Sequence, residues 1–149
     1  MKTEVISFRL PVLLAERLHY YANFHCYENF SELCALALIH YTDAFVHGYL
    51  QFHGGRYKHF EGETVVCGCR VPPVVKKALE LCAFEMVNSV SVACALLLSN
   101  WLAKVEAQDK YERKRRGDRY IPWARGQAEL HRRVAESCLR EVIKTAGEG

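Results

Sequence analysis

The sequence predicts a mainly α-helical protein with one short two-stranded antiparallel β-ribbon and a C-terminal helical tail. Two observations lead to this expectation. A strand pattern followed by two helix patterns occurs twice in the 149 residues, and half of all residues are hydrophobic, which is enough for a core. Each copy alone is about 40 residues long, a size that seldom folds without a partner. Both copies are therefore expected to fold as one domain.

The two copies match in spacing as well as in residue type. Arg9-Leu10-Pro11 and Arg70-Val71-Pro72 are 61 positions apart, whereas Ser31 and Ser91 are 60 positions apart. One residue has therefore been lost from one turn, and both flanks stay in register. The matching positions on the first helix of each copy are Leu14, Leu18 and Ala22, and then Val75, Leu79 and Ala83.

The first strand is expected over residues 3–10, where side chains alternate in type. Ile6, Phe8 and Leu10 would face one side, and Val5, Ser7 and Arg9 the other. Pro11 suits the first turn of the following helix, because it lacks the N–H that this turn leaves unbonded. Asn29, with Glu32 three residues later, predicts the start of a second helix. That helix is apolar almost all round and is expected to be buried.

A linker at residues 54–63 precedes the second copy. Val65, Cys67, Cys69 and Val71 would share one face of its strand, and Val66, Gly68 and Arg70 the other. Pro72-Pro73 opens a helix, and Ser89 or Ser91 caps the next one, which can continue as a charged helix toward Arg116.

Gly117 and Pro122 interrupt that pattern, and a last amphipathic helix spans about Ala124 to Ala146. The predicted divisions are a first repeat at 1–53, the linker, a second repeat at 64–109 and a tail at 110–149.

Cysteine usage indicates a reducing compartment. The seven cysteines are an odd number, and Cys67, Cys69, Cys82 and Cys94 stand where hydrophobic residues are expected. Buried free thiols in a cytoplasmic protein are therefore predicted, not a disulfide framework. No signal-peptide pattern opens the chain and no apolar run reaches the length of a membrane span, so no membrane partner is expected.

Positive charge is concentrated near the C-terminus. The formal net charge is +3, but residues 104–149 carry twelve basic and eight acidic side chains. Within Lys110–Arg125 there are seven basic and two acidic side chains. Such an asymmetry is typical of proteins with a polyanionic partner.

The repeated unit is a strand followed by two helices, with an arginine-hydrophobic-proline junction after the strand and a serine-rich cap on the second helix. This unit resembles the ribbon-helix-helix family of DNA-binding proteins, the Arc/MetJ superfamily. Two copies in one chain resemble its duplicated TraY-type members. The resemblance covers about residues 3–41 and 64–102. It implies an intramolecular pseudo-dimer that places its ribbon in the major groove of double-stranded DNA. It also implies a transcriptional repressor or an accessory factor in conjugative DNA transfer.

The resemblance assigns the candidate site by position. The groove-facing residues would be Val5, Ser7, Arg9, Val66, Gly68 and Arg70. Phosphates would be held at the helix starts, around Asn29, Ser31, Ser89 and Ser91. In addition, the basic tail offers phosphate contacts from Lys110, Arg113, Lys114, Arg115, Arg116, Arg119 and Arg125. Tyr111, Tyr120 and Trp123 lie among these cations, where they can stack on unpaired bases.

Other classes of site have less support. Cys67 and Cys69 match no common zinc spacing, so no metal or cofactor is expected. A ligand set from His40, His47, His53 and His59 with a cysteine is the less favoured alternative. No catalytic motif is present, so the chain is not expected to be an enzyme. The rival function is a protein-interaction module (adaptor, antitoxin or inhibitor) that binds a protein, or a second copy, through the apolar stripe of the C-terminal helix.

Overall fold

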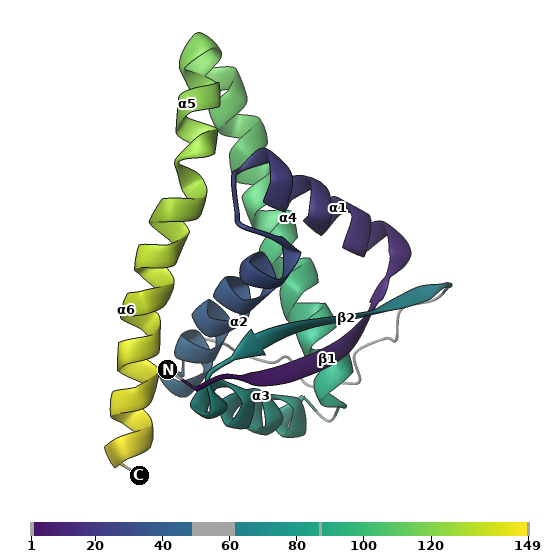
Figure 1. Cartoon of the computed structure of the whole chain (residues 1–149), viewed down its shortest axis with the longest axis vertical. Coiled ribbons are helices and arrows are strands. Elements are labelled where there is room, and N and C mark those ends of the chain that lie inside the picture. Colours follow the sequence, from purple (N-terminus) through teal and green to yellow (C-terminus); the bar gives the residue numbers. More distant parts are fainter. Residues whose placement is uncertain (1, 49–61, 87, 149) are drawn as a thin grey trace.

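The computed structural model describes residues 2–48, 62–86 and 88–148. Two strands, β1 (Glu4–Pro11) and β2 (Thr64–Val71), form an antiparallel ribbon in the lower half of Figure 1. Ser7 lies opposite Gly68 at its centre, and Arg9 and Arg70 lie opposite Val66 and Val5. The chain is thus mainly helical with one two-stranded antiparallel sheet, as the alternating patterns predicted.

Helices make up the rest of the described chain. The first repeat contains α1 (Val12–Phe24) and α2 (Phe30–Val46), and the second contains α3 (Pro73–Glu85) and α4 (Val90–Arg116). A single turn of 3-10 helix at Gly117–Arg119 leads into α5 (Tyr120–Arg125) and α6 (Gln127–Glu148). In Figure 1, α4 rises from beside the ribbon to α5 at the top, and α6 descends again on the left.

One hydrophobic core contains residues from both repeats. Phe8 and Leu10 on β1, together with Cys69 and Val71 on β2, are buried against the helices. The packing is crosswise, since α2 packs on β2 and α4 packs on β1. Neither pair of helices therefore covers only its own strand. Val65 was expected to face the core but is exposed, although Leu10 opposite it is buried, so at this end of the ribbon the core covers β1 and not β2.

The helix starts follow the predicted capping pattern closely. Asn29 caps α2 by accepting a hydrogen bond from the Glu32 N–H at 2.8 Å. At α4 the cap is Ser89, which accepts from the Val92 N–H at 3.2 Å. Ser91 instead accepts a hydrogen bond from the backbone N–H of Arg9 at 2.8 Å. Pro11 differs from the expectation by one position, since it ends β1 and is itself the residue before α1.

The charged extension of α4 runs without a break to Arg116, so the predicted boundary between residues 109 and 110 falls inside a helix. Gly117 ends it with φ of 54°, a backbone conformation that glycine adopts without strain. Pro122 does not interrupt a helix but stands in the first turn of α5, where its missing N–H is tolerated. The last helix begins at Gln127, three residues later than expected.

Helix α6 packs against α2 of the first repeat. Its apolar stripe is partly buried, through Ala128, Ala135, Cys138 and Val142, whereas Leu130, Val134 and Ile143 stay exposed. The ring of His131 accepts a hydrogen bond from the Tyr27 hydroxyl at 2.8 Å and stacks on Trp101 with centroids 5.4 Å apart. Part of the stripe is thus buried against the chain's own core, and its exposed residues remain available to a protein partner or a second copy.

The cysteines behave as small hydrophobic residues. All seven are free, and Cys34, Cys69, Cys82, Cys94 and Cys138 are buried.

Most of the predicted linker at 54–63, with His53 and His59, lies outside the described residues. One stretch of the described chain, Val90–Arg125, is long and apolar enough to pass a composition test for a membrane span. Its apolar half is the core part of α4, and core helices pass the same test.

Candidate nucleic-acid interface

The face of the ribbon that points away from the helices carries all six predicted groove-facing residues. Antiparallel pairing sets Val5 against Arg70, Ser7 against Gly68 and Arg9 against Val66, so the six side-chain positions form three cross-strand pairs on one surface. Val5 is 50% exposed and Val66 61% exposed. Exposed β-branched residues beside two arginines make this a surface with both apolar and cationic contacts to offer.

Gly68 leaves the centre of this face shallow. A Cβ added there would lie 3.1 Å from the carbonyl oxygen of Ile6 on the neighbouring strand. The backbones therefore approach more closely at this position than a side chain readily allows. Ser7 is the only side chain of the central pair.

The two arginines differ in their partners. Arg70 donates a hydrogen bond from Nε to the Thr3 hydroxyl at 3.1 Å. The guanidinium of Arg9 has no hydrogen-bond or ion-pair partner among the described residues. Arg9 is thus the more available of the two for a ligand.

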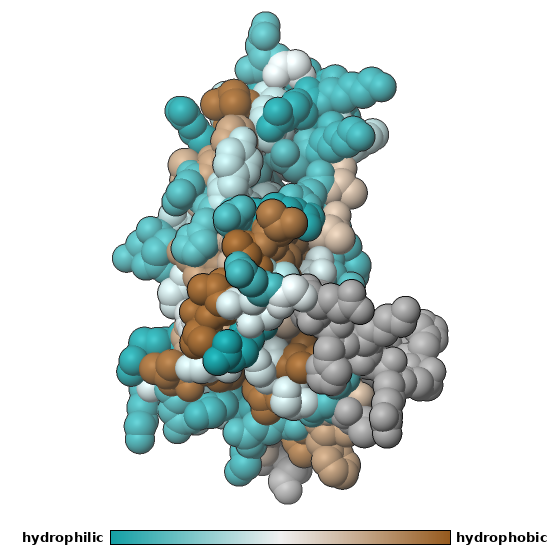
Figure 2. Space-filling view, turned by 90° about the vertical axis from the view of Figure 1, so that its right-hand side faces the viewer, coloured by the Kyte–Doolittle hydropathy of each residue, from teal (hydrophilic) through white to brown (hydrophobic). Residues whose placement is uncertain are grey.

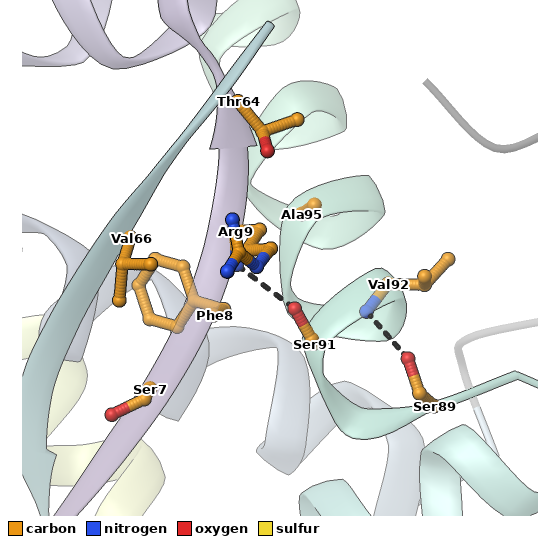
Figure 3. A pocket seen from close by; sticks show the side chains of 9 residues that line it. All are labelled: Ser7, Phe8, Arg9, Thr64, Val66, Ser89, Ser91, Val92 and Ala95. Atoms are coloured by element: carbon orange, nitrogen blue, oxygen red, sulfur yellow. Dashed lines mark hydrogen bonds between the residues drawn. The ribbon is translucent and has the colours of Figure 1, made fainter. Parts of the chain in front are cut away.

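An open pocket of about 590 Å³ lies between the ribbon and the start of α4. Figure 3 shows the Arg9 side chain in this pocket, beside the hydroxyl of Ser91 and above that of Ser89. No acidic residue occupies the first turn of α4. The helix start and the guanidinium therefore present positive charge to the same space.

The start of α2 is occupied by a carboxylate of the chain itself. Glu32 accepts a hydrogen bond from the Glu28 N–H at 3.0 Å and forms an ion pair with Arg132 of α6 at 2.8 Å. Hydrogen bonding from Arg132 lowers the pKa of Glu32, so this carboxylate is ionised at neutral pH. The two predicted phosphate sites, at Asn29–Ser31 and at Ser89–Ser91, are therefore not equivalent.

Three of the seven tail cations are held by neighbouring side chains. Arg113 lies 3.8 Å from the Asp109 carboxylate. Arg115 and Arg116 both pair with Glu112, at 3.2 Å and 2.5 Å. These arginines were predicted as phosphate contacts, but acidic residues one turn earlier on α4 already neutralise much of their charge.

The other four tail cations are exposed and have no ion-pair partner in the described part of the chain: Lys110, Lys114, Arg119 and Arg125. In Figure 2 the upper end of the molecule, where α5 lies, is mainly hydrophilic. An α-helix rises about 1.5 Å per residue, so Lys110–Arg116 lies about 30–40 Å along α4 from Ser91 at the ribbon. We call the end of the molecule that carries these four residues, from the last turns of α4 to α5, the cationic tip. It is a surface separate from the ribbon.

The aromatic residues of the tail mostly build the tip. Tyr120 is buried and its hydroxyl donates a hydrogen bond to Asp109. Trp123 is half-buried, with the guanidinium of Arg116 5.2 Å from its ring centroid. Tyr111 is exposed, so it is the one of the three predicted stacking residues whose ring is well placed to meet a base.

A buried histidine joins the tip to the first repeat. His25, directly after α1, donates a hydrogen bond from Nδ1 to the Ala124 carbonyl of α5 at 2.9 Å. Its Nε2 lies 3.3 Å from the Asp109 carboxylate of α4. The composition gave no sign of this contact, which fixes the turn at the top of α4 against α1.

No group of three or more metal-ligating side chains occurs in the described ranges. His40 lies near Cys138, with 4.0 Å between Nδ1 and Sγ, but no third ligand joins them there.

Comparisons with known proteins found no match: no protein-family model, no curated protein and no solved structure matches the chain. The functional conclusion therefore rests on the chain's own residues.

Proposed function

We propose that the chain is a DNA-binding protein that folds as an intramolecular ribbon-helix-helix pseudo-dimer and inserts its ribbon into the major groove. The observation that carries the proposal is the register of the ribbon. The repeat offset of 61 makes Gly68 the counterpart of Ser7, and these two residues lie opposite each other. Two equivalent strands paired about their common centre are what two chains form in a dimer of this family.

The crosswise packing of α2 on β2 and of α4 on β1 supports the same reading, because each half then depends on the other for its core. On the outer face, arginine can bond guanine bidentately and valine can contact a thymine methyl group. With one serine and one glycine at the centre, the ribbon offers few base contacts. We therefore expect much of the affinity to come from phosphates. Transcriptional repression and DNA transfer are the roles that fit such binding.

Removal of both ribbon arginines tests the proposal. The Arg9→Ala/Arg70→Ala variant is expected to bind duplex DNA at least tenfold more weakly than the parent chain, because a good bidentate arginine contact contributes about 1–3 kcal/mol. Gel shifts at low and moderate salt measure the effect. Glu16→Ala, on the exposed face of α1, is the control. Unchanged affinity of the double variant for every duplex tried would refute the ribbon as the DNA contact.

The cationic tip is proposed as a second phosphate contact. Its distance from the ribbon, about 30–40 Å, is similar to one turn of B-DNA, about 34–36 Å. The tip would then contact the backbone about one turn away from the ribbon, or a second nucleic-acid molecule.

Neutralising the four unpaired tip cations is expected to weaken DNA binding uniformly across sequences. The variant changes Lys110, Lys114, Arg119 and Arg125 to glutamine. Each lost phosphate contact should make the slope of log K against log salt shallower by about 0.9. The matched control changes Lys76, Lys77, Arg133 and Arg140, which removes equal charge elsewhere. Equal slopes for the two variants would exclude a specific role for the tip.

The rival proposal, a protein-interaction module, is favoured by one surface. Leu81 and Phe84 lie one turn apart on α3 and are 59% and 82% exposed. Brown hydrophobic groups are also visible in the lower half of Figure 2. A gel shift with random duplex at low salt separates the two proposals, since no shift would favour the interaction module.

A further inference from the structure

The two helix starts that flank the ribbon differ in charge, although the repeat makes them counterparts. Glu32 stands at the third position of α2, and the offset of 60 makes Val92 its counterpart on α4. At α2 the Glu32 carboxylate accepts the Glu28 N–H. At α4 the first turn carries no acidic side chain. One helix start therefore already holds an anion, and the other is open.

Arg132 does not restore an anion site at the closed end. Its Nη2 and Nε donate to the two carboxylate oxygens of Glu32 at 2.8 Å and 3.1 Å. Its Nη1 donates to Glu129 at 3.3 Å. All three nitrogens of the guanidinium are thus engaged by carboxylates, which leaves little capacity for a phosphate.

The arginines of the ribbon show the same asymmetry. Arg9 lies in the open pocket at the start of α4 with no partner for its guanidinium among the described residues. Arg70 is bonded to Thr3. The free guanidinium and the open helix start therefore face one pocket, lined also by Ser89 and Ser91.

We propose that Glu32 is a built-in anion that fills the phosphate site of the first repeat, so that, of the two helix starts beside the ribbon, only that of α4 holds a phosphate of bound DNA. This inference rests on the proposed ribbon-mediated DNA binding. A protein clamped on one side binds with a fixed polarity. It would recognise an asymmetric site, not the palindrome that a symmetric dimer prefers.

Reciprocal variants test this inference. Val92→Glu places a carboxylate at the open end, where the new side chain and Ser89 would form a capping box, so folding is expected to be preserved. Glu32→Gln removes the charge from the closed end, while Asn29 still caps α2. Val92→Gln and Glu129→Gln are the matched controls. Affinity of the full chain for a short random-sequence duplex is measured at several salt concentrations, and circular dichroism confirms folding.

Val92→Glu is expected to weaken DNA binding about tenfold or more. Loss of about one phosphate contact should also make the slope of log K against log salt shallower by about 0.9. Glu32→Gln is expected to tighten DNA binding several-fold and to make that slope steeper by a similar amount. Both controls should bind like the parent chain.

Two results would overturn the inference while the parent chain still binds DNA. One is equal binding by Val92→Glu and Val92→Gln. The other is a Glu32→Gln variant that binds no more tightly than Glu129→Gln. If the parent chain itself does not bind the duplex at low salt, the proposed function fails, and this inference fails with it.

Discussion

Replacing Phe8 by alanine is expected to lower the free energy of unfolding by about 3–5 kcal/mol, the usual cost of deleting a buried aromatic ring. Phe8 is 1% exposed and belongs to the core cluster that contains both repeats and part of α6. Because that core is continuous, the loss should destabilise the described domain as a whole and not one repeat. Urea unfolding followed by circular dichroism and by tryptophan fluorescence measures it.

Val5→Ala is the matched control, since Val5 lies on the exposed face of the same strand. A surface truncation of this kind is expected to change stability by no more than about 0.5 kcal/mol. Two separate unfolding transitions, or equal losses for Phe8→Ala and Val5→Ala, would contradict a core shared by the two repeats.

Acid is expected to destabilise the protein between about pH 6.5 and pH 4 through His131. Burial lowers the pKa of His131 from 6.5 to about 4, and its neutral ring accepts a hydrogen bond from the Tyr27 hydroxyl. The unfolded chain therefore binds a proton before the folded chain does. Stability is fully present above pH 6.5 and falls as pH approaches 4, by up to about 3 kcal/mol from this residue.

His131→Gln removes this titration while keeping a side chain that can hydrogen-bond to Tyr27. Its unfolding free energy should vary less with pH in that window than that of the parent chain, as measured by urea unfolding at each pH. His19→Gln, at an exposed position on α1, is the control and should keep the parent dependence. A His131→Gln variant with the full parent dependence would show that another group is responsible.

The local patterns of the sequence predicted most of the fold. Alternation in residues 3–10 located β1, and Asn29 with Glu32 located the start of α2. These features depend on neighbours a few residues away. The contacts of His25 with Ala124 and of Arg132 with Glu32 join residues about one hundred positions apart, and no local periodicity encodes such a pair.

The candidate site was predicted less completely than the fold. Its six ribbon residues share one surface, since the two-residue period of a strand fixes which side chains face together. Their availability was not predictable, because it depends on partners. Thr3 engages Arg70, and Glu112 engages Arg115 and Arg116. The sequence did contain a signal for the ion pairs of Glu112, because this residue precedes Arg115 and Arg116 by three and four positions on a helix, the spacing at which side chains meet.

The register of the ribbon also bears on how the chain is made. Pro11 and Thr64, the paired residues that are closest in the sequence, are still 53 positions apart. During synthesis, β1 and the apolar α2 are therefore translated well before β2, the strand that pairs with β1 and packs against α2. The first repeat then presents an unpaired strand edge and uncovered hydrophobic surface, the features that favour aggregation. A nascent chain that stalls before residue 64 lacks β2, which completes both the ribbon and the core, and should therefore need a chaperone to stay in solution.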